Sequence, residues 1–315
     1  MKSFYHLYHE ALVKRFIGSN DELFHFQTRI DQALAGIRGE ERVQREFQES
    51  MHDKDYLMLT NLQFINEHGF PHQIDILLLT TQFIMLAEVK NISGTLSYDN
   101  KLRQFQRVRF DGVHESFPNP FDQLQRHHEF LYYLLRNGKF QIPIIPIIIN
   151  ANYNANFDQS LRDQPIINVS SLRTKLSELR KQYRVVTTTK NLLTIQNFLK
   201  NQTVFHEANR YVPYHSIQKG VLCPVCDYKS LMLYENKTWR CLQCNKTNRK
   251  ALKMALKDYR ILVSPEITNK AFREWTNINN VYTASKILHR LAFPSKGGNR
   301  NRVYFIPQEY MFLEI

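Results

Sequence analysis

Apolar residues recur with a helical period over the first part of the chain. The first 35 residues form an amphipathic helical pattern, and residues 36–47 predict the opening of another helix, in which Val43 and Phe47 share one face. The pattern then changes, and residues 56–64 predict a strand that ends at a turn rich in Asn, Gly and Pro. The chain therefore begins with helices and continues into a sheet.

The next segment, from His72 to Asn91, predicts a hairpin of two apolar strands. Thr81 and Gln82 are the only polar break between the two runs, and two-residue loops are the commonest hairpin connections. With the loop placed there, Thr80 lies opposite Phe83. Every other pair of the hairpin follows from this register.

Further elements follow the hairpin. Residues 119–140 predict a helix, residues 140–150 a buried strand with prolines at its margins, and residues 183–189 another strand. A helix is also predicted through Leu192 to Leu199. The apolar stripe of the 119–140 helix comprises Leu124, His128, Leu131 and Leu135. Strands and helices mixed in this order predict an α/β domain over residues 1–205.

Two smaller modules are predicted after a polar and aromatic linker. Residues 206–248 contain all four cysteines, with the alternation of a small hairpin between them. Residues 249–315 are basic and contain three helical patterns separated by short turns. The sequence therefore predicts three modules.

Composition restricts the class of protein. Apolar residues make up 43 % of the chain and aromatic residues 12 %, which argues against disorder. No apolar run approaches the roughly 20 residues of a membrane-spanning helix, and the N-terminus lacks the uninterrupted apolar segment of a signal peptide, so we expect a cytoplasmic protein. The formal net charge of +13 favours an anionic partner, either nucleic acid or an acidic membrane surface.

Three charged residues stand out in the apolar hairpin. The register places Asp75 opposite Glu88, and alternation puts Lys90 on the same face as Glu88. Directly opposed like charges are destabilising, so a cation is expected between the carboxylates. Mg²⁺ suits two carboxylates, and it can activate water and neutralise charge on a phosphodiester, while Lys90 would stabilise charge in the transition state. Alternatively, Lys90 only neutralises one carboxylate at the end of the sheet.

Several short motifs surround these charges. They are Gly39-Glu40 at a helix start, Gln73-Ile74-Asp75, Glu88-Val89-Lys90-Asn91 with Gly94 close behind, and Asn119-Pro120 followed by Gln123. Over residues 36–135 the chain thereby resembles the nuclease-related domain, NERD, a branch of the PD-(D/E)xK nuclease superfamily. One departure is that the superfamily's Pro before the Asp is replaced by Ile74, which is usual for this branch.

The resemblance implies a fold and a set of roles. The fold would be a PD-(D/E)xK nuclease-like mixed sheet flanked by helices, and the activity would be metal-dependent hydrolysis of phosphodiester bonds. The implied ligands of Mg²⁺ or Mn²⁺ are Asp75, Glu88 and the Val89 carbonyl. Lys90 would be the catalytic lysine, Glu40 would bind the metal or orient its water, and Gln123 would position substrate or water. Glu40 and Gln123 can equally be ordinary polar residues of their helices.

The cysteines predict a separate metal site. Cys223-Pro-Val-Cys226 and Cys241-Leu-Gln-Cys244 are two CxxC pairs with fourteen residues between them, which is zinc-ribbon spacing. Four thiolates close the coordination shell, so we predict structural zinc. The ribbon would either contact nucleic acid through its basic residues or brace the neighbouring domain.

The C-terminal module has the pattern of a helix-turn-helix. The middle and third helical patterns of this module would form the motif. The third helix would enter the major groove of DNA, and the basic loop after it would contact phosphate as a wing. The predicted nucleic-acid contacts are Lys286, Arg290, Arg300 and Arg302. The alternative is a three-helix packing module with a solvated basic face.

Together these patterns predict a magnesium-dependent nuclease, specifically a deoxyribonuclease, whose zinc is structural. DNA is favoured over RNA only because of the C-terminal module. The main alternative is a non-catalytic DNA-binding or regulatory protein that retains the nuclease fold. A second alternative is a structural adaptor whose basic modules bind a protein or a membrane surface.

Overall fold

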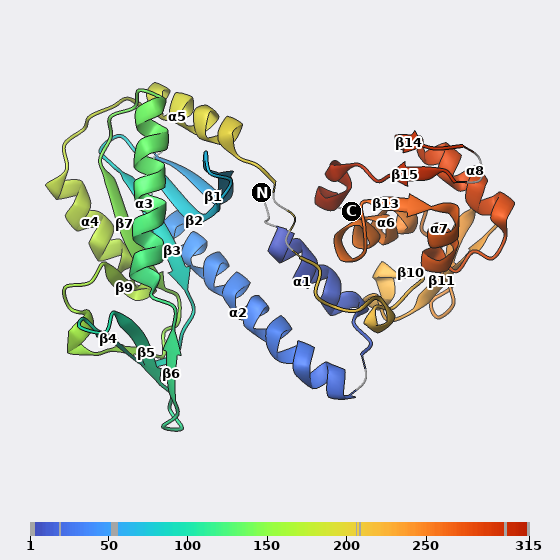
Figure 1. The fold of residues 1–315 in the computed structure, drawn as a ribbon, viewed down its shortest axis with the longest axis horizontal. Coiled ribbons are helices and arrows are strands. Elements are labelled where there is room, and N and C mark those ends of the chain that lie inside the picture. The colour runs from blue at the N-terminus through green and yellow to red at the C-terminus, as the bar shows by residue number, and fades with distance from the viewer. Residues whose placement is uncertain are drawn as a thin grey trace. The chain divides into compact units, whose positions relative to one another are not determined.

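The computed structural model describes residues 4–18, 20–51, 56–205, 207, 209–298 and 301–313; the side chains of residues 20–23 and 25–27 are excepted. The chain divides into two compact units (Figure 1). One unit comprises residues 34–206, and the other combines residues 2–33 with residues 207–315. The division falls within a single helix, α2 (Asn20–Ser50).

A five-stranded mixed sheet forms the centre of the first unit, in the order β1-β2-β3-β7-β9. The first three strands are antiparallel, and the last two run parallel to β3. The strands are β1 (Tyr56–Ile65), β2 (Pro71–Thr80), β3 (Ile84–Lys90), β7 (Ile144–Asn150) and β9 (Ile166–Asn168). This architecture, with helices on both faces of the sheet, confirms the predicted α/β class.

Alternate residues of the central strands face two separate cores. On one face Ile76, Leu78 and Met85 pack with residues of α2 and of α4 (Leu172–Gln182). On the other face Leu77, Leu79 and Leu86 pack with residues of α3 (Pro120–Asn137) and α5 (Thr189–Gln202). In β3 the period of two sends Glu88 and Lys90 toward α3, the side of Leu86. In β2 the alternation breaks at Asp75, because Ile74 packs in the same core as Leu77 and Leu79.

A second sheet follows β3 in the chain and has the order β6-β5-β4-β8. Its strands are β4 (Gly94–Asp99), β5 (Gln104–Val108), β6 (His114–Phe117) and β8 (Ala155–Phe157). Short 3₁₀ turns at Gln159–Leu161 and Val169–Ser171 complete the unit.

Several local predictions were wrong for tertiary reasons. Residues 36–47 do not open a helix, because α2 already runs from Asn20. Val43 and Phe47 nevertheless share one face of that helix, as predicted, and both are fully buried. Residues 183–189 form no strand: Val186 and Thr187 donate to the Thr81 carbonyl in the hairpin turn.

Two further details differ from the sequence-based predictions. In α3 the buried histidine is His127, and the predicted His128 is only half-buried. Pro146 lies inside β7 rather than at its margin, opposite Leu86 of β3. The other predicted strands and helices of the first unit are confirmed.

The second unit contains the cysteine segment and the basic C-terminal segment. The cysteine segment forms a small sheet of β10 (Val221–Leu222), β11 (Leu231–Glu235) and β12 (Thr238–Cys241), with 3₁₀ turns at Tyr214–Ser216 and Pro224–Cys226. The predicted small hairpin is thus confirmed.

The basic segment alternates helices with short strands. The elements are α6 (Ala251–Leu262), β13 (Glu266–Thr268), α7 (Asn269–Thr276), α8 (Val281–Leu291), β14 (Ser295–Lys296), β15 (Val303–Phe305) and a 3₁₀ turn at Gln308–Phe312. Phe272 and Trp275 are fully buried, and the indole of Trp275 donates to the Ala255 carbonyl at 2.8 Å. These contacts hold α7 against α6.

Helix α1 (Phe4–Arg15) belongs to the second unit, whereas the sequence pattern predicts residues 1–35 within the N-terminal domain. The side chain of Arg15 is buried and lies 2.6 Å from Asp258 of α6. Arg15 also donates to the carbonyls of Gln218 and Gly220. A buried cation needs such partners, so this network ties α1 to α6. None of the helices in the described ranges has the length and apolar composition that crossing a bilayer requires.

Candidate functional site

The β2–β3 hairpin has the predicted register. Leu79 pairs with Ile84, and Ile76 pairs with Ala87. Continued by one residue, the same register places Asp75 opposite Glu88. The Thr80 hydroxyl closes the turn, because it donates to the Phe83 carbonyl at 2.8 Å and accepts the backbone N–H of Phe83 at 3.0 Å. The turn thus sets which residues meet at the opposite end of the hairpin.

The backbone ladder between β2 and β3 ends at the pair Ile76–Ala87. Beyond it, the carboxylate of Asp75 accepts the backbone N–H of Val89 at 2.8 Å. Asp75 and Glu88 are both buried, with 9 % and 5 % of their surface exposed. Two buried carboxylates therefore lie where the strands separate.

Lys90 connects this pair to α3. Its ammonium lies 2.7 Å from Oε1 of Glu88 and donates to Oε1 of Gln123 at 3.2 Å. The structure therefore brings together Glu88, Lys90 and Gln123, from the hairpin and from a helix that begins about 30 residues later.

The start of α3 places Gln123 in reach of Lys90. Asn119 caps the helix by accepting the N–H of Phe121 at 3.0 Å, and Pro120 occupies the first helical position. The amide of Asn119 also donates to the Tyr98 hydroxyl at 3.3 Å. The Asn-Pro pair of the sequence motif thus fixes where α3 begins.

Gly39 allows α2 to approach the end of β3. A Cβ atom at this position would lie 2.8 Å from the Cβ of Asn91, too close for any other residue. The amide of Asn91 donates to the Ala35 carbonyl at 2.6 Å and holds the helix there. This contact brings Glu40 near enough for its charge to act on Asp75.

The electrostatics of the site favour a cation. Burial, followed by the charges of Glu88 and Glu40, raises the pKa of Asp75 well above its ordinary value. The Val89 N–H and the Lys90 ammonium act in the opposite direction but do not cancel the effect. Two buried carboxylates with a third nearby are the oxygen donors that Mg²⁺ prefers, so these residues fit such an ion.

Asn61 is a further residue of the site that the sequence motifs do not include. It lies between the ladder pairs Thr60–Ile76 and Leu62–Ile74, and therefore opposite Asp75. Its φ angle is 53°, and its side-chain oxygen is buried with no hydrogen-bond partner in the described part of the chain. An asparagine inside a predicted strand was the available signal, since Asn is depleted in strands and tolerates this conformation.

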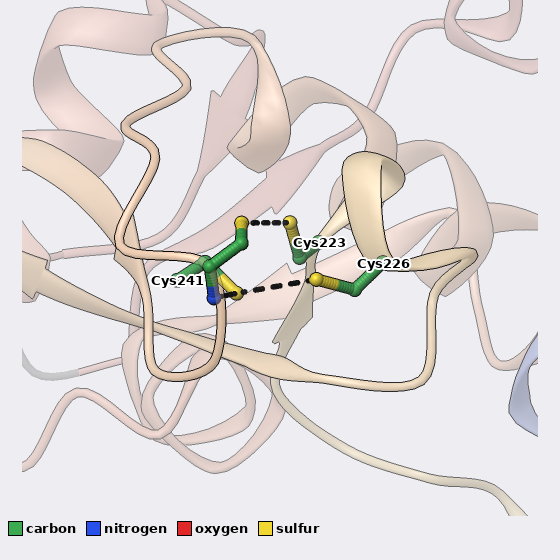
Figure 2. A group of neighbouring side chains, drawn as sticks. Cys223, Cys226 and Cys241 are labelled. Atoms are coloured by element: carbon green, nitrogen blue, oxygen red, sulfur yellow. Dashed lines mark hydrogen bonds between the residues drawn. The ribbon is translucent and has the colours of Figure 1, made fainter.

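The four cysteines converge at the base of the small sheet (Figure 2). The Sγ atoms of Cys223 and Cys244 are 3.8 Å apart, as are those of Cys226 and Cys241, and all four lie within 4.8 Å of one another. A tetrahedral ion with Zn–S bonds of about 2.3 Å would separate its sulfurs by about 3.8 Å. The group can therefore hold one zinc ion and is not arranged as disulfides.

Hydrogen bonds prepare one of these thiols for a metal. Burial alone would raise the pKa of Cys241, but the Ser230 hydroxyl and the N–H groups of Cys244 and Gln243 lower it to about 6. Ser230 Oγ lies 3.4 Å from the Cys241 sulfur. Such bonds stabilise a thiolate, which is the form that binds zinc.

Three of the four predicted nucleic-acid contacts lie on or beside α8. Lys286 and Arg290 belong to α8 and are both exposed, and a guanidinium nitrogen of Arg302 lies 3.3 Å from Nε2 of His289. Arg300 is outside the described residues. The left-handed Asn277 ends α7, and Asn280 caps α8 by accepting the N–H of Thr283 at 2.9 Å.

Comparison with known families identifies one part of the chain. Residues 35–151 match the family model of the nuclease-related domain, NERD, which confirms the resemblance seen in the sequence. The match includes Glu40, Asp75, Glu88, Lys90 and Gln123. The family match agrees with the nuclease-like mixed sheet of the first unit. No curated protein and no solved structure matches the chain.

Proposed function

We propose that the nuclease-related domain at residues 35–151 is a metal-dependent nuclease that hydrolyses phosphodiester bonds, with DNA as its substrate. The observation that carries the proposal is the buried arrangement of Asp75, Glu88 and Lys90 at the open end of the hairpin. A carboxylate pair joined to a lysine supplies both a cation site and a positive charge for the transition state.

Asp75 and Glu88, with the Val89 carbonyl and with Glu40 nearby, are the residues that would hold Mg²⁺ or Mn²⁺. When bound, such an ion lowers the pKa of water and neutralises charge on the phosphate. Lys90 is held between Glu88 and Gln123, so its ammonium is preorganised to stabilise the negative charge that develops on the phosphate. Gln123 accepts from Lys90 through its oxygen, and its amide nitrogen is a donor that would orient water or substrate.

A simple salt bridge accounts less well for these residues. Lys90 bonds to Glu88, yet the pKa of Asp75 remains raised by burial and by the two other carboxylates. A purely structural cluster with this excess of negative charge would be unfavourable, because buried like charges destabilise the fold. Binding of a cation offers a reason for the arrangement.

The C-terminal elements support DNA as the partner. Two helices, α7 and α8, are joined by a four-residue turn, and the strands β14 and β15 pair after them as a basic hairpin. The cations of α8 and the Arg302–His289 contact lie together on this segment. A helix with a basic strand pair beside it suits a major groove and its flanking phosphates.

The proposal is tested by incubating the purified chain with supercoiled plasmid, linear duplex and RNA of the same sequence. Mg²⁺ or Mn²⁺ should support cleavage of DNA, and EDTA should stop it. If the wild-type protein binds DNA but leaves all substrates intact with either metal, the non-catalytic alternative is correct.

DNA affinity should depend on the cations of α8. We expect Lys286→Ala combined with Arg290→Ala to weaken binding and to reduce the slope of log K against log salt by about 0.9 for each phosphate that the variant no longer neutralises. Fluorescence anisotropy over a salt series measures this slope.

The matched control is Arg249→Ala combined with Lys253→Ala, which removes the same charge at the start of α6. It should lower affinity only slightly and leave the slope near that of the wild type. Equal effects of the two double variants would mean that α8 makes no specific phosphate contacts.

A further inference from the structure

A pocket of about 830 Å³ lies between α3 and the start of β2 in the first unit. The residues that matter here are Phe70, His72, Arg126, His127, Phe130 and Tyr133. Its volume falls within the roughly 300 to 1,000 Å³ of small-molecule sites. The predicted catalytic residues are not part of its lining.

The pocket begins where the catalytic cluster ends. Gln123, which bonds to Lys90, and His127, which lines the pocket, are one turn apart on α3 and share a face. On β2, His72 is three residues from Asp75, a separation of about 10 Å along the strand. A molecule bound at Lys90 can therefore extend into the pocket.

Flat, uncharged rings line the pocket beside the cluster. The ring of His72 stacks on Phe130 with centroids 4.2 Å apart and an angle of 12° between the planes. The Nδ1 atoms of His72 and His127 are 3.2 Å apart, a contact that requires at least one neutral ring.

Both histidines are neutral near pH 7. Burial, followed by the charges of His72 and Arg126, lowers the pKa of His127 to about 4. Burial and the charge of Arg126 also lower the pKa of His72. The pair therefore offers ring faces and hydrogen-bonding edges rather than positive charge.

Two large aromatic side chains of the pocket are left exposed. Phe70 is 65 % exposed and Tyr133 is 62 % exposed. Both line the pocket together with Arg126, which supplies a cation, and Glu129, which supplies an acceptor. Aromatic faces with a few polar groups at the edge match the surface of a nucleobase.

We infer that this pocket binds an unpaired nucleobase of the substrate strand, beside the phosphate that is cut at Lys90. The inference rests on the proposed function, which it deepens by naming the substrate class: single-stranded nucleic acid, or a strand whose end or target base leaves the duplex. A base stacked inside a helix cannot enter such a pocket without flipping out.

Binding in EDTA tests this independently of cleavage. A single-stranded oligonucleotide is compared with a series in which each position in turn is abasic, using fluorescence anisotropy and the full chain. The wild type should lose about 5- to 150-fold in affinity at one position, the equivalent of one stacked base, and little elsewhere.

The matching variants are Phe70→Ala and Tyr133→Ala, with Tyr132→Ala as the control. Tyr132 is the neighbour of Tyr133 on α3 and is 47 % exposed, but it does not line the pocket. Each pocket variant should weaken single-strand binding. In these variants an abasic site at the sensitive position should cause no further loss of affinity, whereas Tyr132→Ala should behave as the wild type. Binding to a blunt duplex of equal length should be unchanged in all three.

Several outcomes would overturn the inference. They are an abasic scan of the wild type with no sensitive position, a sensitive position that Phe70→Ala and Tyr133→Ala leave unaltered, and no binding of single strands. The abasic scan needs no variant, so poor folding of a variant does not remove the test. If the abasic position and the pocket variants affect binding as expected but the chain never cuts DNA, only the nuclease proposal is refuted. If the chain cuts DNA but the pocket variants do not alter the effect of the abasic position, only the pocket inference is refuted.

Discussion

Replacement of Glu88 by glutamine should abolish metal-dependent cleavage and leave DNA binding intact. Glu88 is buried, faces Asp75 across the hairpin and holds Lys90 at 2.7 Å, so its charge serves both the cation site and the lysine. Glutamine keeps the shape but removes the charge that a divalent ion needs. Lys90→Ala should slow cleavage by about 10²- to 10³-fold, the cost of losing one group that stabilises transition-state charge. Plasmid nicking and anisotropy on the same preparations measure both quantities.

Glu115→Gln is the control for this prediction. Glu115 forms an ion pair with Arg107 in the second sheet of the same unit, and its replacement should leave cleavage unchanged. Wild-type cleavage by Glu88→Gln protein would show that the hairpin cluster is not the active site.

Asp75→Asn distinguishes loss of the metal from loss of the fold. Because the folded-state pKa of Asp75 lies above its ordinary value of 3.8, the folded state loses stability relative to the unfolded chain as pH rises from 3.8 toward the folded-state pKa. Asparagine removes this cost and can still accept the Val89 N–H. The metal-free variant should therefore have a Tm equal to or above that of the wild type, with a gap that widens as pH rises above 3.8. Mg²⁺ should raise the Tm of the wild type only.

Removal of zinc should unfold the cysteine segment. The purified chain should contain one zinc ion, because four thiols converge at tetrahedral spacing and, besides Cys241, β11 and β12 bury only Met232 and Trp239. In Cys241→Ser protein, or after chelation, amide hydrogens of β11 and β12 should exchange rapidly, as hydrogen exchange with mass spectrometry would detect.

Ser230→Ala provides a graded control for the zinc site. Its hydroxyl lies 3.4 Å from the Cys241 sulfur but is not a ligand, so its loss should weaken zinc binding by about 10- to 100-fold without unfolding the sheet. Protein without zinc that keeps protected β11 and β12 amides would contradict a structural metal.

Much of the site was accessible from the sequence because it depends on local rules. Strands have a side-chain period of two, so a polar break at Thr81 and Gln82 was enough to place Asp75 opposite Glu88. The Asn-Pro pair that opens α3 and the two CxxC pairs are short-range signals of the same kind. Each constrains only residues that are close in the chain.

Other features were decided only by the tertiary structure. The approach of α2 to β3 at Gly39, the contact of Lys90 with Gln123 and the choice of His127 over His128 depend on segments far apart in sequence. Residues 183–189 have the composition of a strand, yet the N–H groups of Val186 and Thr187 donate to the hairpin turn and no strand forms. Propensity is worth fractions of a kilocalorie per residue, and packing against distant segments outweighs it. The sequence by itself therefore determined which charged residues meet at the end of the hairpin, and the fold decided which other residues surround them.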